Sequence, residues 1–485
     1  MDFVIIANAW SAGADNPTSK HRIALELARR GNRILWLEGA GMRSPSISSG
    51  SDRGRIIRKI ALSLRGARLV RSNVPTHSHQ PSLAEASSSA EATADKSEGK
   101  PSTLRRSPSY GGQAINHQPS PTGTAGDIWV LTPLPIPLPR FGIVRCFNGW
   151  LYRILAKRWA GRIGFNSPIL INYVPVLANA MKNWSPHQPF PPHNVIYHCV
   201  DRWDSFDMYD SVMMKEMDDE CCRNADLVIA SSSELLERCR TRNPKSPLVM
   251  HGVDHDHFAG AVAGEPGKQK PSDLPEGRIV GFFGLLSEWL DQELLIKLAR
   301  ALRSTASSTF GGTQASASAV TEPVTLQKTE DTNHQPANPP SLVLIGTADV
   351  PVDRLKSEPN IFMLGPKPFS ELPRYIRHFD VGIIPFVVND LTRAVNPIKL
   401  REMLAAGCPV VSTALPEVER IAKYGETFLG STVIAHTHEE FMESVERRLI
   451  SSLSTAERRT ISDSMTGETW QAKVGEILGI ITGEG

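Results

Sequence analysis

The sequence lacks the features that identify several common classes of protein. Its six cysteines follow no metal-binding spacing, so a reduced protein of the cytosol is the simplest interpretation. No apolar run is long enough to span a bilayer. Residues 1–6 carry an acid where a signal peptide carries cations. We therefore expect a cytoplasmic protein without a membrane-spanning helix. The cysteines are Cys146, Cys199, Cys221, Cys222, Cys239 and Cys408.

A strong net charge is also missing. Lysine and arginine number 53 against 51 acids, which leaves a formal net charge of +2. This balance argues against a protein that binds nucleic acid through charge alone. The length of 485 residues is enough for two or three domains with cores of their own.

Two low-complexity segments interrupt the chain, at 72–126 and 304–340. They are rich in Ser, Ala, Thr and Pro, and they contain too few apolar residues to offset the entropy of ordering, so we predict that both are disordered. The remaining sequence alternates strands with helices, which is typical of α/β domains built on parallel sheets. We divide it into a domain at 1–258, a linker at 259–277, a domain at 278–465 and a helix at 466–485. The helix could cross back to the first domain.

The most informative segment is 396–412. Asn396 is a good N-cap and Pro397 suits the first position of a helix. Gly407 ends this helix, and an apolar strand follows. Because a helix N-terminus carries free N–H groups and a partial positive charge, it can hold a phosphate group.

Two charged residues strengthen that interpretation. Lys399 lies in the first turn, and Glu402 follows three residues later on the same helix face. A cation for a diphosphate beside a carboxylate for sugar hydroxyls is what a nucleotide-sugar site requires. The alternative is that both are solvated surface charges of an ordinary helix.

The order of motifs along the chain resembles that of the group 1 (family 4-like) glycosyltransferases of the GT-B fold. Within them, the sequence is most similar to the teichuronic-acid and exopolysaccharide transferases. The motifs that carry the resemblance cover nearly everything outside the two inserts. They are Thr18–His21, Val200–Trp203, Ala230–Ser233, His251–Asp254, Gly281–Gly284, Trp289–Asp291, Leu344–Gly346, Leu364–Pro366, Pro397–Gly407 and Leu415–Val418.

The resemblance implies two Rossmann-like domains that face each other across a cleft. The C-terminal domain would bind a nucleotide-diphosphate sugar, and the N-terminal domain would bind an acceptor, either a polysaccharide or a lipid-linked glycan. It further implies a metal-independent hexosyltransferase-type reaction without a cofactor. One position departs from the pattern, because retaining members carry a Glu-x7-Glu pair and the first of these positions is Ala394 here. Whether the reaction retains or inverts the configuration therefore stays open.

Candidate site residues fall into three groups. Asp201, directly after a strand and beside Trp203, is our candidate for the base, with a helix cap as the alternative. Lys399 and Glu402 complete the catalytic group. The expected acceptor-side residues are Lys20, His21 and Trp203. The expected donor-binding residues are Gly284, Leu364, Arg393, Asn396, Pro397, Lys399 and Glu402. No metal ligands are expected.

The segment 140–162 is basic and aromatic. No acid occurs between Asp127 and Asp201, while Arg and Lys alternate with Phe, Trp and Tyr in this segment. This composition is typical of a helix that lies on anionic lipid. A packed helix with a solvated basic face is the alternative. Contact with the membrane would make the protein peripheral on the inner face of the cytoplasmic membrane.

These observations predict a glycosyltransferase of cell-envelope glycan synthesis. Two alternatives remain open at this stage. The first is a nucleotide-sugar epimerase on the same fold, and the second is a non-catalytic relative that binds nucleotide, which the missing acid at Ala394 keeps possible.

Overall fold

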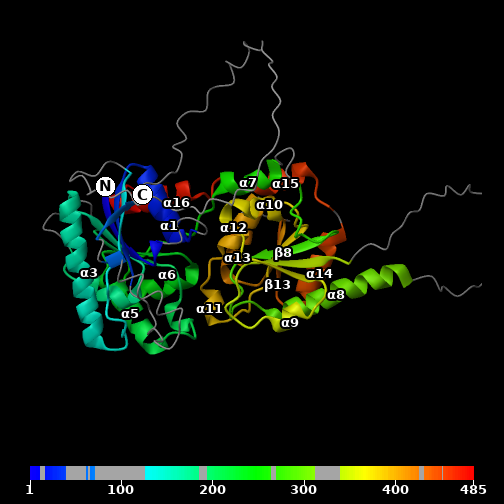
Figure 1. Ribbon diagram of the computed structural model, residues 1–485, viewed down its shortest axis with the longest axis horizontal. Coiled ribbons are helices and arrows are strands. Elements are labelled where there is room, and N and C mark those ends of the chain that lie inside the picture. Colours follow the sequence, from blue (N-terminus) through cyan, green and yellow to red (C-terminus); the bar gives the residue numbers. More distant parts are fainter. Residues whose placement is uncertain are drawn as a thin grey trace, which may run out of the picture.

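The computed structural model describes residues 1–10, 17–39, 62–63, 66–70, 126–184, 194–263, 269–311, 339–424, 431–450 and 452–484. They form two α/β domains that lie side by side, and both chain ends lie at the first domain (Figure 1). The expected fold class, two parallel-sheet domains, is confirmed. The remainder of the predicted inserts, 72–125 and 312–338, lies outside the described residues.

The first domain is built on a seven-stranded sheet in the order β3-β4-β2-β1-β5-β6-β7. β3 is antiparallel to β4, and the other pairs are parallel. Apart from β3, which is short and largely exposed, the strands are buried runs rich in apolar residues, as expected when helices cover both faces of a sheet. They are β1 (Asp2–Ala7), β2 (Arg33–Glu38), β3 (Arg68–Val70), β4 (Ile128–Leu131), β5 (Ile169–Asn172), β6 (Val195–Cys199) and β7 (Leu227–Ala230). The helices are α1 (Ser19–Arg29), α3 (Gly142–Ile163), α4 (Ala178–Met181), α5 (Ser211–Asn224) and α6 (Ser233–Arg240).

The second domain repeats the plan with a six-stranded parallel sheet in the order β10-β9-β8-β11-β12-β13. Its strands are β8 (Ile279–Phe283), β9 (Ser341–Ile345), β10 (Ile361–Gly365), β11 (Val381–Ile384), β12 (Val410–Thr413) and β13 (Thr432–Ala435). Its helices are α7 (His255–Ala263), α8 (Gln292–Gly311), α9 (Asp353–Lys356), α10 (Leu372–Ile376), α11 (Asp390–Arg393), α12 (Ile398–Ala405), α13 (Pro416–Tyr424), α14 (His438–Ile450) and α15 (Thr455–Asp463).

The last helix, α16 (Trp470–Thr482), packs against α1 of the first domain. Four of its side chains are buried in the apolar core of that domain: Trp470, Val474, Ile477 and Ile481. Its docking ties the end of the chain to the first domain, so the chain crosses between the domains twice.

Three boundaries differ from the expected ones. The predicted linker at 259–277 begins inside α7, and α8 continues past residue 304 into the predicted second insert. The C-terminal helix expected at 466–485 begins only at Trp470, as α16. The cause is that the chain just before this helix pairs with the segment that leads into α7. The N–H of Val253 donates to the carbonyl of Glu468, and the N–H of Trp470 donates to the carbonyl of Val253.

Candidate functional site

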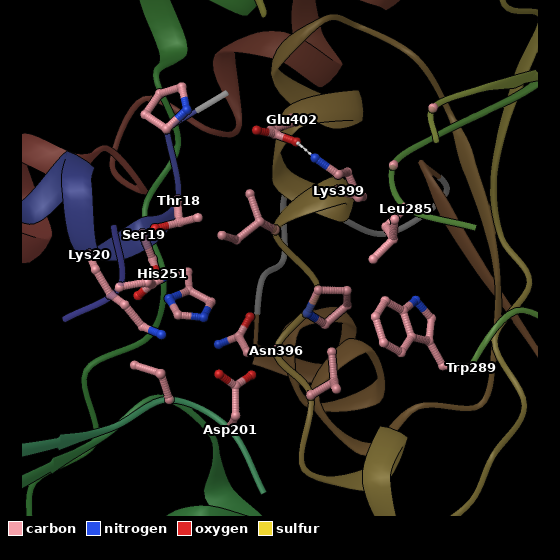
Figure 2. Close-up of a pocket in the computed structure, with 18 of the residues that line it drawn as sticks. Thr18, Ser19, Lys20, Asp201, His251, Leu285, Trp289, Asn396, Lys399 and Glu402 are labelled. Atoms are coloured by element: carbon pink, nitrogen blue, oxygen red, sulfur yellow. Dashed lines mark hydrogen bonds and ion pairs between the residues drawn. The ribbon is translucent and has the colours of Figure 1, made fainter. Parts of the chain in front are cut away.

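A cleft of about 990 Å³ lies between the two domains. The chain lines it with residues that directly follow strands of both sheets, among them Asn8 after β1, Asp201 after β6, Gly284 after β8 and Gly346 after β9. The carboxyl ends of parallel strands are where ligands of such sheets bind. We call the side formed by the first domain, which includes Lys20, Asp201, Trp203 and His251, the first-domain wall. The side formed by the second domain, which includes Gly284, Gly346, Lys399 and Glu402, is the second-domain wall (Figure 2).

The second-domain wall presents Lys399 and Glu402 from the start of α12. Lys399 Nζ donates to Glu402 Oε2 at 2.8 Å and lies 4.7 Å from the ring centre of Phe283. Figure 2 shows this pair with both side chains at the cleft. The spacing of three residues along one helix places the two groups together, as the sequence predicted.

Two glycines lie near this pair. Gly284 has φ +146° and Gly346 has φ +152°, a region that favours glycine. A Cβ on Gly346 would lie 1.7 Å from the carbonyl oxygen of Gly284, so only glycine fits where these two loops meet. A Cβ on Gly284 would reach within 3.4 Å of Lys399 Cε. A side chain at position 346 would therefore collide with the neighbouring loop, whereas a Cβ at position 284 would stand in ordinary van der Waals contact with the Lys399 side chain.

The start of α12 differs from the prediction. Pro397, not Asn396, is the N-cap, and Asn396 lines the cleft with its amide already bonded on both sides. Its Nδ2 donates to the carbonyl of Ser231 at 2.8 Å, and its Oδ1 accepts from Arg401 at 2.7 Å. Because Ser231 belongs to the first domain, Asn396 links the domains instead of capping the helix.

The first-domain wall carries Lys20 and Asp201. Lys20 is only 7% exposed, and its ammonium lies 5.1 Å from the ring of Trp203 and 5.8 Å from that of Tyr173. Burial lowers the pKa of Lys20, and the charge of Asp201 opposes this shift. Burial likewise raises the pKa of Asp201, while Lys20 lowers it. Figure 2 shows both side chains at the same side of the cleft, near His251 and Asn396.

Trp203 and His251 complete this wall. Trp203 is 5% exposed, and its indole Nε1 is buried without a hydrogen-bond partner among the described residues. The pKa of His251 is lowered to about 3, first by burial and then by Arg401, so this ring is neutral at physiological pH. The described residues contain no group of three or more His, Cys, Asp or Glu arranged to hold a metal ion.

Three predicted site residues do not line the cleft. His21 is fully buried, with Nδ1 2.8 Å from the Thr18 hydroxyl, Nε2 3.2 Å from the carbonyl of Ala9 and its ring stacked on Trp36. It therefore holds the start of α1 and is not an acceptor contact. Arg393 is exposed at the end of α11. Leu364 itself lies within β10, and the cleft is lined instead by Pro366 and Lys367, which follow that strand.

Ala394, where the resemblance leads one to expect a carboxylate, is 1% exposed and packs with the apolar core of the first domain. The neighbouring acid, Asp390, is exposed. The position is therefore an apolar contact between the domains. A charged side chain there would be costly unless it were paired.

Sequence reasoning missed Arg22 and His251 as cleft residues. Arg22 lies in α1 directly after His21, and its side-chain contacts with Asp254 and Phe369 hold it at the cleft. His251 stands within one of the motifs that carry the family resemblance. The motif was the one indication that His251 belongs to the site, but a motif alone does not show whether its histidine forms part of a turn or lines the cleft.

Comparisons with known proteins agree with this architecture. Residues 324–451 match the family model described as Glycosyl transferases group 1. A Bacillus subtilis (strain 168) protein named as a teichuronic acid biosynthesis glycosyltransferase, TuaH, is 26% identical over 286 residues, or 53% of this chain and 62% of that protein. The match thus spans less than two thirds of that relative.

Solved structures show the same fold at low identity. Sucrose-phosphate synthase from Thermosynechococcus elongatus superposes with a TM-score of 0.56 at 12% identity, over 98% of this chain and 97% of the other. HepE from Anabaena, in complex with UDP-glucose, superposes with a TM-score of 0.50 at 12% identity, over 99% of both chains. The chain therefore has the GT-B fold.

Proposed function

We propose that this chain, which has the GT-B fold and carries a group 1 glycosyltransferase match in its second domain, is a glycosyltransferase. It would move a sugar from a nucleotide-diphosphate donor to a lipid-linked or polysaccharide acceptor in cell-surface glycan synthesis. The observation that carries the proposal is the pairing of two different charged sites across one cleft. Lys399 and Glu402 lie on the second-domain wall, and Lys20 and Asp201 lie on the first-domain wall.

The second-domain wall is suited to the donor. Lys399 would stabilise the negative charge that develops on the leaving diphosphate, and Glu402 would accept hydrogen bonds from ribose hydroxyls. Gly284 lies beside the Lys399 side chain. HepE, whose structure holds UDP-glucose, has the same fold, which supports a nucleotide-sugar as the donor.

The first-domain wall is suited to the acceptor. Asp201 would take the proton of the acceptor hydroxyl, and its raised pKa brings it closer to the working range of a general base. Lys20 favours the ionised carboxylate. The indole N–H of Trp203, which has no partner among the described residues, can donate to a sugar hydroxyl.

The configuration of the product follows from these roles. Ala394 supplies no second carboxylate on the donor side, whereas Asp201 supplies a base on the acceptor side. A base-assisted direct displacement inverts the anomeric centre, so we propose an inverting transfer. We further propose that the chain's own cations take the place of a metal at the diphosphate.

The outer face of α3 supports a contact with the membrane. The buried face of this helix includes Tyr152, Ala156 and Ala160, while Ile143, Phe147, Trp150 and Ile154 form an exposed apolar stripe. Before the helix, four more exposed apolar side chains continue this surface: Leu134, Ile136, Leu138 and Phe141. In Figure 1, α3 lies at the edge of the first domain away from the second domain.

Cations flank the apolar stripe at Arg140, Lys157, Arg158 and Arg162, all exposed. We propose that this surface binds anionic lipid at the cytoplasmic face of the membrane, where it would meet a lipid-linked acceptor. No helix among the described residues has the length and apolar character needed to cross a bilayer.

Flotation with liposomes tests the membrane proposal. At low salt we expect vesicles that contain phosphatidylglycerol to retain the wild type, and vesicles of phosphatidylcholine alone to retain much less. Phe147→Ser with Trp150→Ser should lose this retention. Ile450→Ser, which changes an 81% exposed apolar residue on the second domain, should not. Equal retention of all three proteins would contradict the proposal.

A donor screen tests the function as a whole. The protein is incubated with UDP-, GDP-, ADP- and TDP-sugars and a crude lipid-linked glycan acceptor, and nucleotide release is measured. A transferase releases nucleotide faster when acceptor is present. Conversion of the donor sugar without nucleotide release would indicate an epimerase, and nucleotide binding without turnover would indicate a non-catalytic relative.

A further inference from the structure

We propose that Arg22, on the first-domain wall, binds a phosphate oxygen of the donor nucleotide. This inference rests on the proposed function and adds a residue from the opposite domain to the donor site. It has a structural consequence: the donor site is complete only when the two domains are closed on each other.

Arg22 is held at the cleft by one residue just before α7 and by one residue of the second domain. Its Nη1 donates to Asp254 Oδ2 at 2.9 Å, and its guanidinium lies 4.3 Å from the ring centre of Phe369 in the second domain. The side chain is 17% exposed and lines the cleft. A stacked guanidinium with one nitrogen fixed by a carboxylate is rigid, so little further ordering is needed when it binds a ligand.

The other terminal nitrogen of the guanidinium, Nη2, makes no hydrogen bond to the described residues. It is also buried. A buried charged donor without a partner is expensive, and most such groups in folded proteins are satisfied. A ligand oxygen in the cleft would supply the missing acceptor.

Charge in the cleft points to an anion as that ligand. Four cations line it, and Lys367 is already paired with Asp273 at 2.7 Å. Lys20 lies near Asp201, and Lys399 is bonded to Glu402. A nucleoside diphosphate ester carries about two negative charges, more than Lys399 alone can balance while it also faces Glu402.

The position of Arg22 matches the donor side of the cleft and not the acceptor side. Burial lowers the pKa of Arg22, and the charges of Asp254 and of Glu402, a residue we assign to the donor ribose, oppose this shift. Figure 2 shows the start of α1, at Thr18 to Lys20, across the cleft from Lys399 and Glu402. A diphosphate between these elements would meet Lys399 from one wall and Arg22 from the other.

The competing explanation is that Arg22 only clamps the two domains together through Asp254. Calorimetry separates the two explanations. The wild type is titrated with UDP, GDP, ADP and TDP, and the tightest of these and its nucleoside are then titrated into the variants. The variants are Arg22→Gln, Arg22→Lys, Asp254→Asn and the matched control Arg29→Gln, which lies on the same helix and pairs with Glu26 at 2.7 Å.

We expect Arg22→Gln to weaken the diphosphate about 10- to 100-fold, the effect of losing a hydrogen bond to a charged group. Binding of the nucleoside should not change, because it has no phosphate. Arg22→Lys should fall between Arg22→Gln and the wild type. Asp254→Asn should bind like the wild type, because the amide oxygen can still accept from Nη1 and Nη2 remains available to the ligand. Arg29→Gln should match the wild type.

Two results would overturn the inference. The first is an Arg22→Gln protein that binds the diphosphate like the wild type. The second is an equal loss in Arg22→Gln and Asp254→Asn that extends to the nucleoside, which would identify a clamp. If Arg22→Gln does not fold, Arg22→Lys and Asp254→Asn still decide the question. A wild type that binds no nucleotide would instead remove the proposed function itself.

Discussion

The two walls of the cleft are built in different ways. On the second-domain wall, Lys399 and Glu402 form a direct ion pair on one helix, near two glycines. On the first-domain wall, Lys20 and Asp201 are each buried enough to shift their pKa values away from the usual range, in opposite directions. On the second-domain wall, the Lys399 side chain is 30% exposed, so a ligand in the cleft can reach its ammonium. On the first-domain wall, burial disfavours the charged forms of both the acid and the cation.

This difference suggests a division of labour. Binding a diphosphate requires a charge that is already ionised and accessible, whereas proton transfer requires a group whose pKa has been moved toward the working pH. Lys399 on the second-domain wall is accessible to a ligand, and Asp201 on the first-domain wall has a raised pKa. The predictions below change one wall at a time.

The largest effect is expected for Asp201→Asn. The amide has nearly the same shape but cannot take up a proton, so kcat should fall about 100- to 10,000-fold while the KM for the donor changes little. Steady-state kinetics with varied donor measures both. Asp204→Asn is the control, because Asp204 accepts from Arg238 at 2.6 Å and does not line the cleft. Full activity of Asp201→Asn would rule out this base.

The next effect is expected for Lys399→Ala. Loss of the ammonium should lower kcat/KM for the donor about 10- to 100-fold, since a hydrogen bond to a charged group is removed both from the bound donor and from the leaving diphosphate. Lys367→Ala should have a smaller effect, because we assign no donor contact to that ammonium and its partner, Asp273, does not line the cleft. Unchanged donor kinetics in Lys399→Ala would remove our assignment of the donor site.

Gly346→Ala should disturb the second-domain wall through the backbone. The new Cβ would collide with the carbonyl of Gly284, and the positive φ adds strain of about 1–3 kcal/mol. We expect a lower Tm and weaker nucleotide binding. Gly161→Ala in α3, where a Cβ meets nothing within 4 Å, should instead stabilise by about 0.5–1 kcal/mol. Equal Tm values for both variants would show that the loops can move apart.

The smallest effect is expected for Lys20→Gln, which should change the pH dependence of kcat/KM. The cation of Lys20 favours the carboxylate of Asp201, so its removal raises the pKa of Asp201 further. The base then ionises only at higher pH, and the acidic limb of the kcat/KM profile should shift upward. A profile identical to the wild type would show that the two groups do not interact during catalysis.

Much of the second-domain wall could be predicted from the sequence because its information is local. Lys399, Glu402 and the helix stop at Gly407 lie within one segment, and helical spacing alone puts the two charges together. Asn396 was misassigned because its amide serves the other domain. An N-cap preference cannot reveal that the carbonyl of Ser231 lies within reach.

The first-domain wall is assembled from distant parts of the chain. Lys20, Asp201 and His251 come together only through the order of strands in the sheet and the crossing of α1 toward the second domain. Strand-end position identified Asp201, but nothing in the sequence separated Lys20, which faces the cleft, from His21, which packs on Trp36. Arg22 required the contact between the domains to be seen.

The central claim, that the second-domain wall binds the donor and the first-domain wall performs the proton transfer, is tested most directly by one calorimetric comparison. A nucleoside diphosphate is titrated into wild type, Lys399→Ala and Asp201→Asn under the same conditions. We predict that Asp201→Asn binds as tightly as the wild type and that Lys399→Ala binds at least about 10-fold more weakly. Weakened binding in Asp201→Asn with unchanged binding in Lys399→Ala would contradict the account.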